Sequence, residues 1–126
     1  MSDTRKILCI EDDLDLTDIL KAILKSRGFQ VFGARGGREG LEALRRVQPD
    51  IVLLDLMMPG MDGWEVYGRM QAEPDLCDIP VIIVTADDQP VTRARALDVV
   101  KVDGFVAKPF NAQELVQRIE EILGSD

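Results

Sequence analysis

The sequence predicts an α/β fold, a doubly wound parallel sheet with helices on both faces. Five short apolar stretches of strand length recur along the 126 residues, and stretches with helical spacing of apolar residues separate them. Three of the five are almost continuous Ile, Val and Leu, which is typical of parallel strands that are buried on both faces. Strands that alternate with helices indicate a parallel sheet whose connections are right-handed.

The five predicted strands differ in how apolar they are. The first, third and fourth are the near-continuous apolar runs, whereas the second and fifth are shorter or mixed in composition. We place the strands at residues 6–10, 29–33, 50–54, 80–84 and 104–107. Among the topologies available to a (βα)5 chain, we expect the flavodoxin-like strand order 2-1-3-4-5.

The first three helices are predicted from apolar residues at helical spacing. The first follows Asp13, a residue type that favours the N-cap position, and it stops before Gly28, which suits a helix end. The second and third are expected around residues 41–47 and 64–70.

The last two helices carry clear start signals. The fourth is expected to begin near Pro90, since proline suits a first helical turn, and to run to about Val99. The fifth begins with "NAQE", in which Asn111 is the N-cap and Glu114 follows three residues later, similar to a capping box.

Length, charge and cysteine content limit the class of protein. The length suits one domain, so we expect a single unit over residues 1–126 with its core at about 6–123. The net charge of −8 argues against direct nucleic-acid binding. No apolar run reaches the roughly 18 residues of a membrane span, and two cysteines make no disulfide framework, so we expect no membrane contact and a cytoplasmic location. Because the chain lacks histidine, any histidine chemistry must come from a partner.

Polar residues stand at the carboxyl ends of four predicted strands. These residues are Glu11 and Asp12, then Asp55, Thr85 and Lys108. Parallel strands end at one edge of the sheet, so we expect the side chains to converge there. Three or four crowded carboxylates repel one another, and a hard divalent cation such as Mg²⁺ offsets that repulsion. With an ammonium, a hydroxyl and backbone N–H groups nearby, the set would hold a phosphoryl group, and Asp55 would be its nucleophile.

Each of these residues also has an ordinary structural explanation. Acidic residues after strands commonly cap helices, and a threonine or a Lys-Pro pair at a strand end is common in loops. The functional interpretation depends on their coincidence at one predicted edge rather than on any single residue.

Four segments together resemble the receiver domain of bacterial two-component response regulators, over about residues 6–123. They are "CIEDD", "PDIVLLDLMMPGMDGWEV", "IPVIIVTA" and "DGFVAKPFNAQELVQRI". The resemblance implies that a histidine kinase or a histidine phosphotransfer protein donates a phosphoryl group to this chain. It also implies a signalling domain rather than an enzyme, although such a domain assists its own phosphorylation and dephosphorylation.

The resemblance further implies a phosphorylation and metal site. Asp55 would accept the phosphoryl group and would also ligate Mg²⁺. Asp12 would ligate the ion directly, Glu11 would act through water, and the backbone carbonyl of Met57 would complete the protein ligands.

A switch is implied by the same resemblance. The hydroxyl of Thr85, beside Ala86, would turn toward the phosphoryl group, and Lys108 would bind it. Phe105, where the family often has tyrosine, would follow Thr85 inward. The peptide bond that precedes Pro109 would be cis.

The face made by the fourth helix, fifth strand and fifth helix would then engage a downstream protein or a fused output domain. Its mixed charges would also suit a phosphorylation-dependent homodimer, although a solvated helix surface is an equal alternative. The charged residues in question are Arg93, Asp103, Glu114 and Arg118. The sequence is compatible with a complete single-domain regulator and with a receiver cut from a longer protein.

Two other functions compete with this interpretation. One is a pseudo-receiver, a phosphorylation-independent interaction module, and the complete set of site residues argues against it. The other is a Mg²⁺-dependent aspartyl phosphohydrolase. Such enzymes usually place a second aspartate two residues after the nucleophile, where this chain has Met57.

Overall fold

The central sheet has the predicted topology. The computed structural model describes residues 4–124, and within that range a parallel sheet pairs in the order β2-β1-β3-β4-β5. Its strands are β1 (Lys6–Ile10), β2 (Gln30–Ala34), β3 (Ile51–Leu54), β4 (Val81–Thr85) and β5 (Gly104–Ala107). The flavodoxin-like α/β prediction is therefore confirmed, and each predicted strand boundary lies within one residue of the observed one.

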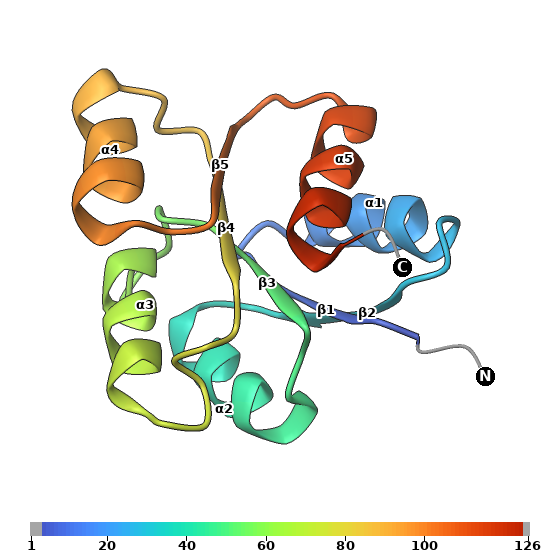
Figure 1. The fold of residues 1–126 in the computed structure, drawn as a ribbon, viewed down its shortest axis with the longest axis horizontal. Helices are drawn as coiled ribbons and strands as arrows, with labels where there is room; N and C mark the ends of the chain where they lie inside the picture. The colour runs from blue at the N-terminus through green and yellow to red at the C-terminus, as the bar shows by residue number, and fades with distance from the viewer. Residues whose placement is uncertain (1–3, 125–126) are drawn as a thin grey trace.

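Helices cover both faces of the sheet (Figure 1). On one face lie α1 (Leu14–Lys25) and α5 (Ala112–Leu123). On the other face lie α2 (Gly37–Val47), α3 (Gly63–Ala72) and α4 (Pro90–Ala94). No helix within residues 4–124 combines the length and the apolar character needed to cross a membrane.

Two apolar clusters, one on each face, explain why the strands are apolar along their whole length. In β1, Leu8 and Ile10 belong to the cluster beneath α2 and α3, whereas Ile7 and Cys9 belong to the cluster beneath α1 and α5. Side chains alternate between the two faces of a strand, so a sheet covered on both sides needs apolar residues at every position.

The predicted helix starts at Asp13 and Asn111 are both confirmed. The Asp13 carboxylate accepts hydrogen bonds from the backbone N–H groups of Asp15 and Leu16. The Asn111 side-chain oxygen likewise accepts hydrogen bonds from two N–H groups in the first turn of α5. At the other end of α1, Gly28 has a φ of +93°, which favours glycine as the chain turns into β2.

The fourth helical segment differs from the prediction of one regular helix to about Val99. The α-helix α4 stops at Ala94, and a π-helical segment, η1 (Arg95–Val100), follows it. A π turn holds one residue more than an α turn, so this segment winds more widely than the regular α-helix that was predicted. Lys101, in the left-handed region with a φ of 66°, then ends the segment.

Gly63 brings the start of α3 directly against the end of β3. Its N–H donates to the Leu56 carbonyl at 3.0 Å, and a Cβ at this position would overlap the backbone carbonyl oxygen of Asp55. The absence of a side chain at Gly63 therefore fixes how closely α3 approaches the loop that follows Asp55.

We expect Gly63→Ala to lower the free energy of unfolding by about 1–3 kcal/mol, because the added methyl group forces the backbone apart. Gly68→Ala is the matched control on the same helix, since nothing lies within 4 Å of a Cβ there. Alanine at this helical position should stabilise the protein by about 0.5–1 kcal/mol. Urea denaturation measures both changes, and equal effects of the two substitutions would contradict the close approach at Gly63.

Candidate functional site

Lys108, just after β5, links two buried carboxylates at the carboxyl edge of the sheet. Its Nζ lies 2.6 Å from Oε1 of Glu11 and 3.1 Å from Oδ2 of Asp55. Both acidic residues are only 5% exposed, so water contributes little to their solvation. Three residues that the sequence placed at one edge are thus joined by direct charge-assisted hydrogen bonds.

The backbone fixes both carboxylates at the ends of their strands. The N–H of Asp55 donates to the Ile10 carbonyl at 3.1 Å, which continues the pairing of β3 with β1. The second oxygen of Asp55 accepts from the Met57 N–H at 3.1 Å, and the second oxygen of Glu11 accepts from the Asp13 N–H at 3.0 Å. Each carboxylate therefore uses one oxygen for its own loop and offers the other to Lys108.

Burial and charge act against each other in this cluster. Burial raises the pKa of the Glu11 carboxyl, and the hydrogen bond from Lys108 only partly offsets that effect. Burial alone would lower the pKa of Lys108, but its bonds to Glu11 and to Asp55 outweigh burial and raise it. Lys108 is therefore a stable ammonium at neutral pH, and it supplies the positive charge that this pair of acids requires.

Thr85 lies at the end of β4, beside the Lys108 backbone. The Thr85 carbonyl accepts from the Lys108 N–H at 2.8 Å, and its fully buried hydroxyl accepts from the Asp87 N–H at 3.3 Å. Ala86, the next residue, is exposed. The peptide bond between Lys108 and Pro109 is cis.

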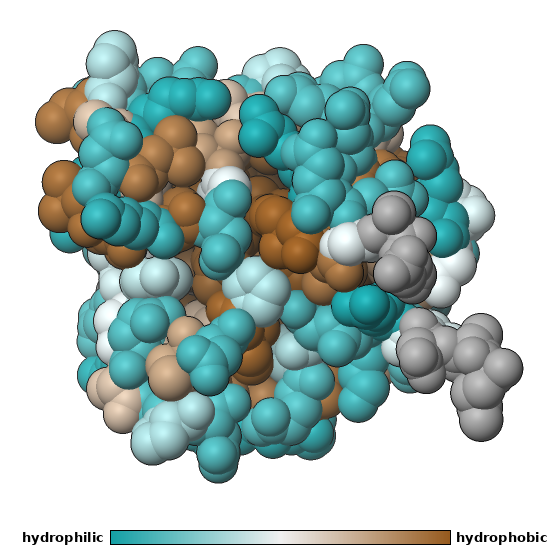
Figure 2. Space-filling view, in the orientation of Figure 1, coloured by the Kyte–Doolittle hydropathy of each residue, from teal (hydrophilic) through white to brown (hydrophobic). Residues whose placement is uncertain are grey.

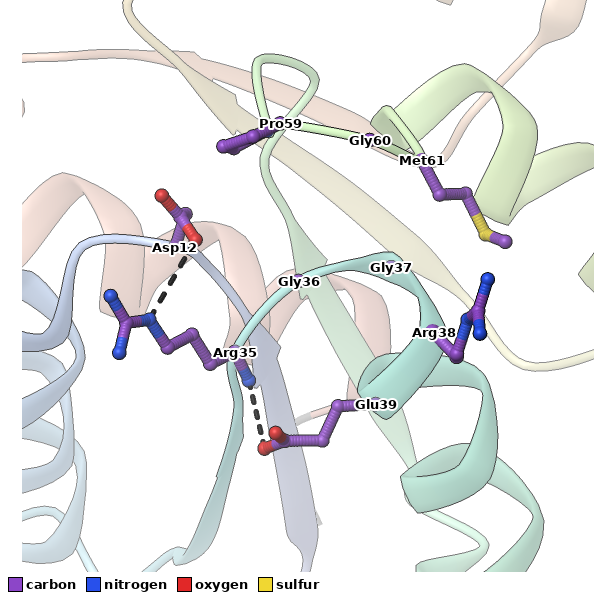
Figure 3. A pocket seen from close by; sticks show the side chains of 9 residues that line it. All are labelled: Asp12, Arg35, Gly36, Gly37, Arg38, Glu39, Pro59, Gly60 and Met61. Carbon is purple, nitrogen blue, oxygen red and sulfur yellow. Dashed lines mark hydrogen bonds and ion pairs between the residues drawn. The ribbon is translucent and has the colours of Figure 1, made fainter.

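Asp12 does not join the buried cluster. Its carboxylate lies 3.8 Å from the guanidinium Nε of Arg35, at the rim of the site (Figure 3). The described residues contain no group of three acidic, cysteine or histidine side chains arranged to hold a metal ion. Lys108 thus bridges Glu11 and Asp55, while Arg35 pairs with Asp12 at the rim.

The donor types still fit a hard divalent cation. Glu11, Asp12, Asp55 and the backbone carbonyl of Met57 are all oxygen donors, which Mg²⁺ prefers over nitrogen or sulfur. Met57 is 60% exposed, so its part of the loop is open to solvent. These four residues are the ones that would hold Mg²⁺.

The residues predicted for an output face are all exposed, on α4, just before β5 and on α5. Phe105 is buried in β5, and the Arg93 guanidinium lies 5.0 Å from the centre of its ring. Arg93 also approaches Asp88 at 3.6 Å. Asp103 is exposed, and its carboxylate accepts a hydrogen bond from the Val81 N–H at 2.8 Å. This bond anchors the start of β4.

The two remaining candidates of this face, Glu114 and Arg118, are exposed on α5. No ion pair involves either of them in the part of the chain that the structure describes. Nearby, Val91 and Val99 are 70% and 74% exposed, and apolar surface gathers around α4 in Figure 2. The face is therefore charged on α5 and partly apolar around α4.

Sequence reasoning missed two contacts near the site. Arg35 directly follows β2 and so lies at the same edge of the sheet as the predicted site residues, which is a signal that the sequence carries. The second contact is the Thr92 hydroxyl, which donates to the Asp87 carboxylate at 2.9 Å and ties the loop after β4 to α4. No sequence pattern indicated that bond.

Comparison with known proteins identifies the family. The family model for the response regulator receiver domain matches residues 7–120. The chain therefore belongs to the receiver domains of two-component response regulators, which are signalling domains.

Solved receiver domains have the same fold over nearly the whole chain. The N-terminal domain of a response regulator receiver protein from Methanoculleus marisnigri is 34% identical, with a TM-score of 0.77, and the match covers 97% of this chain and 98% of that one. The receiver domain of a signal transduction histidine kinase from Syntrophus aciditrophicus is 33% identical, with a TM-score of 0.85 and coverage of 95% and 90%.

A third similar structure contains a metal. It is the receiver domain of a sensor histidine kinase from Pseudomonas aeruginosa, which is 25% identical, with a TM-score of 0.86 and coverage of 97% and 99%. That protein has a magnesium ion coordinated in its active-site cleft.

We expect Lys108→Met to raise the pKa of Glu11 further, because the substitution removes the charge-assisted hydrogen bond and leaves the carboxyl buried. Carboxyl ¹³C NMR titration in buffer free of divalent cations measures this pKa. Lys25→Met, at the exposed end of α1, is the control and should leave Glu11 unchanged. A lower or unchanged pKa in Lys108→Met would contradict the role of the ammonium.

The pH dependence of stability gives an independent check. Because the pKa of Glu11 is raised in the folded state, the folded protein binds more protons than the unfolded chain at pH values between 4.5 and the raised value. The Glu11 contribution to the free energy of unfolding should therefore fall as pH rises through this window. Glu11→Gln should remove this pH-dependent contribution. If the free energy of unfolding of Glu11→Gln depended on pH as in the wild type, a raised pKa of Glu11 would be contradicted.

Proposed function

We propose that this receiver domain accepts a phosphoryl group on Asp55 from a histidine kinase or a histidine phosphotransfer protein. What supports the proposal is the Lys108 ammonium, held 3.1 Å from an Asp55 oxygen at the open edge of the sheet. A carboxylate nucleophile beside a fixed positive charge suits the acceptance of a phosphoryl group, whose oxygens carry negative charge.

In the proposed reaction an Asp55 oxygen attacks the phosphorus of phosphohistidine. An O–P bond forms, the N–P bond breaks, and the histidine leaves with the electron pair of its ring nitrogen. Lys108 binds the transferred group, and the Met57 N–H fixes the orientation of the Asp55 carboxylate. Mg²⁺, held by Glu11, Asp12, Asp55 and the Met57 carbonyl, would supply further positive charge for the phosphoryl oxygens.

The phosphoryl group would then bias a two-state switch. The Thr85 hydroxyl turns toward the new charge and gives up its bond with the Asp87 N–H. Phe105, which packs beneath Arg93, moves into the space that Thr85 leaves. The face of α4, β5 and α5 repacks in consequence and controls a downstream protein, a fused output domain or a second copy of this chain.

The whole of residues 1–126 acts as one unit in this proposal, with its core at about 6–123. The chain works in the cytoplasm and binds neither membrane nor nucleic acid directly. Arg93, Asp103, Glu114 and Arg118 would form the charged part of the output or dimer surface.

The proposal predicts an added phosphoryl mass after incubation with acetyl phosphate and Mg²⁺, measured by intact-protein mass spectrometry. EDTA should abolish the addition because the metal offsets the charge of the phosphoryl oxygens. Asp55→Asn should abolish it because the nucleophile is lost, whereas Asp78→Asn, on an exposed loop, should not. Phosphorylated histidine donor protein serves as a second donor. No added mass with either donor would favour the alternative pseudo-receiver function.

The switch predicts that beryllofluoride and Mg²⁺ shift the amide NMR signals of residues 85–118. Thr85→Ala should reduce the changes in the amide signals of α4 and β5, because alanine has no hydroxyl to hydrogen-bond the bound beryllofluoride. Thr4→Ala is the control, because Thr4 is exposed and precedes β1, at the edge of the sheet opposite the site. Unchanged signals over residues 85–118 in the wild type would contradict the switch while leaving phosphorylation possible.

A further inference from the structure

A pocket beside the buried cluster contains a charged residue that the proposed reaction does not use. The pocket is open and has a volume of about 320 Å³. The loop after β2, the start of α2 and the loop after β3 form its walls (Figure 3). Asp12, a residue of the proposed metal site, lines it together with Arg35 and Arg38.

Arg35 is placed beside Asp12 by the register of the sheet. The strand partner of Ile10 is Ala34, and the Ala34 carbonyl accepts from the Glu11 N–H at 3.1 Å. The residues that follow these partners therefore leave the sheet side by side. The pairing of the two main chains therefore places Arg35 near Asp12, whatever rotamers their side chains adopt.

The Arg35 backbone is also anchored from α2. Its N–H donates to the Glu39 carboxylate at 3.0 Å, and Gly36, with a φ of +92°, turns the chain into the helix directly afterwards. The guanidinium Nε then lies 3.8 Å from Oδ1 of Asp12 (Figure 3).

We propose that Arg35 is a positioning residue that competes with the divalent cation for the Asp12 carboxylate, an inference that rests on the metal site of the proposed function. A carboxylate paired with a guanidinium must weaken that pair to ligate a metal ion. The fraction of molecules ready to bind the ion is then reduced, and the apparent dissociation constant is raised by the same factor. Arg35 thereby sets the Mg²⁺ concentration at which the domain becomes competent for phosphorylation.

The expected size of the effect follows from the exposure of the pair. The side chains of Arg35 and Asp12 are 60% and 39% exposed, so water screens their attraction. Ion pairs of this kind correspond to about a two- to five-fold change in an equilibrium constant. Arg35→Gln should therefore tighten Mg²⁺ binding by about two- to five-fold.

Arg38→Gln is the matched control. Arg38 lines the same pocket, is also exposed, and loses the same charge on substitution. Figure 3 shows its guanidinium beside Met61, with no ion pair drawn to Asp12, and none is present among residues 4–124. A comparison of the two variants separates the specific pair from the general loss of positive charge.

The experiment is a titration with MgCl₂ alone, followed by the amide NMR signals of residues 10–13 and 55–58. The inference expects tighter binding in Arg35→Gln, little change in Arg38→Gln, and an intermediate or unchanged value in Arg35→Lys. Equal tightening in both glutamine variants, or no tightening in Arg35→Gln, would overturn it. Asp12→Asn tests the underlying site separately. If Mg²⁺ binds the wild type and Asp12→Asn equally, the proposed metal site itself is wrong.

Discussion

The structure of this site depends on one interaction, the bridge from the Lys108 ammonium to the Glu11 and Asp55 carboxylates. Two acidic residues that are each 5% exposed would repel each other strongly without a positive charge between them. Three strands, β1, β3 and β5, must end at the same edge for this bridge to form. The parallel sheet and its strand order bring these ends together, and the close approach at Gly63 places α3 against the loop that follows Asp55.

The bridge also explains why the site suits a reaction in which charge is added. Lys108 is shared between two carboxylates, and Asp12 is paired with Arg35. Each of the three carboxylates proposed to ligate the cation therefore already lies close to a positively charged side chain. In the proposed function, Mg²⁺ and the phosphoryl group would exchange these partners instead of creating a site from separated residues.

Sequence alone predicted the fold and most of the site because both depend on simple periodic rules. Apolar runs of strand length, alternating with helical spacing, led to the strand order, and the order led to the shared edge of Glu11, Asp55 and Lys108. The pairing of Asp12 with Arg35 and the π-helical segment Arg95–Val100 were not predicted. The π-helical segment depends on local hydrogen-bond geometry, which the spacing of apolar residues does not encode. Arg35 was missed for a different reason, since it follows a strand end that carries no acid.

The proposed function depends above all on Asp55 as the residue that takes the phosphoryl group. The most direct measurement is borohydride reduction of the phosphorylated protein followed by peptide mass spectrometry, because borohydride converts an aspartyl phosphate to homoserine and leaves free aspartate intact. The account predicts homoserine at position 55 and at no other acidic position. Homoserine at Asp12 or Asp13, with Asp55 unmodified, would contradict it.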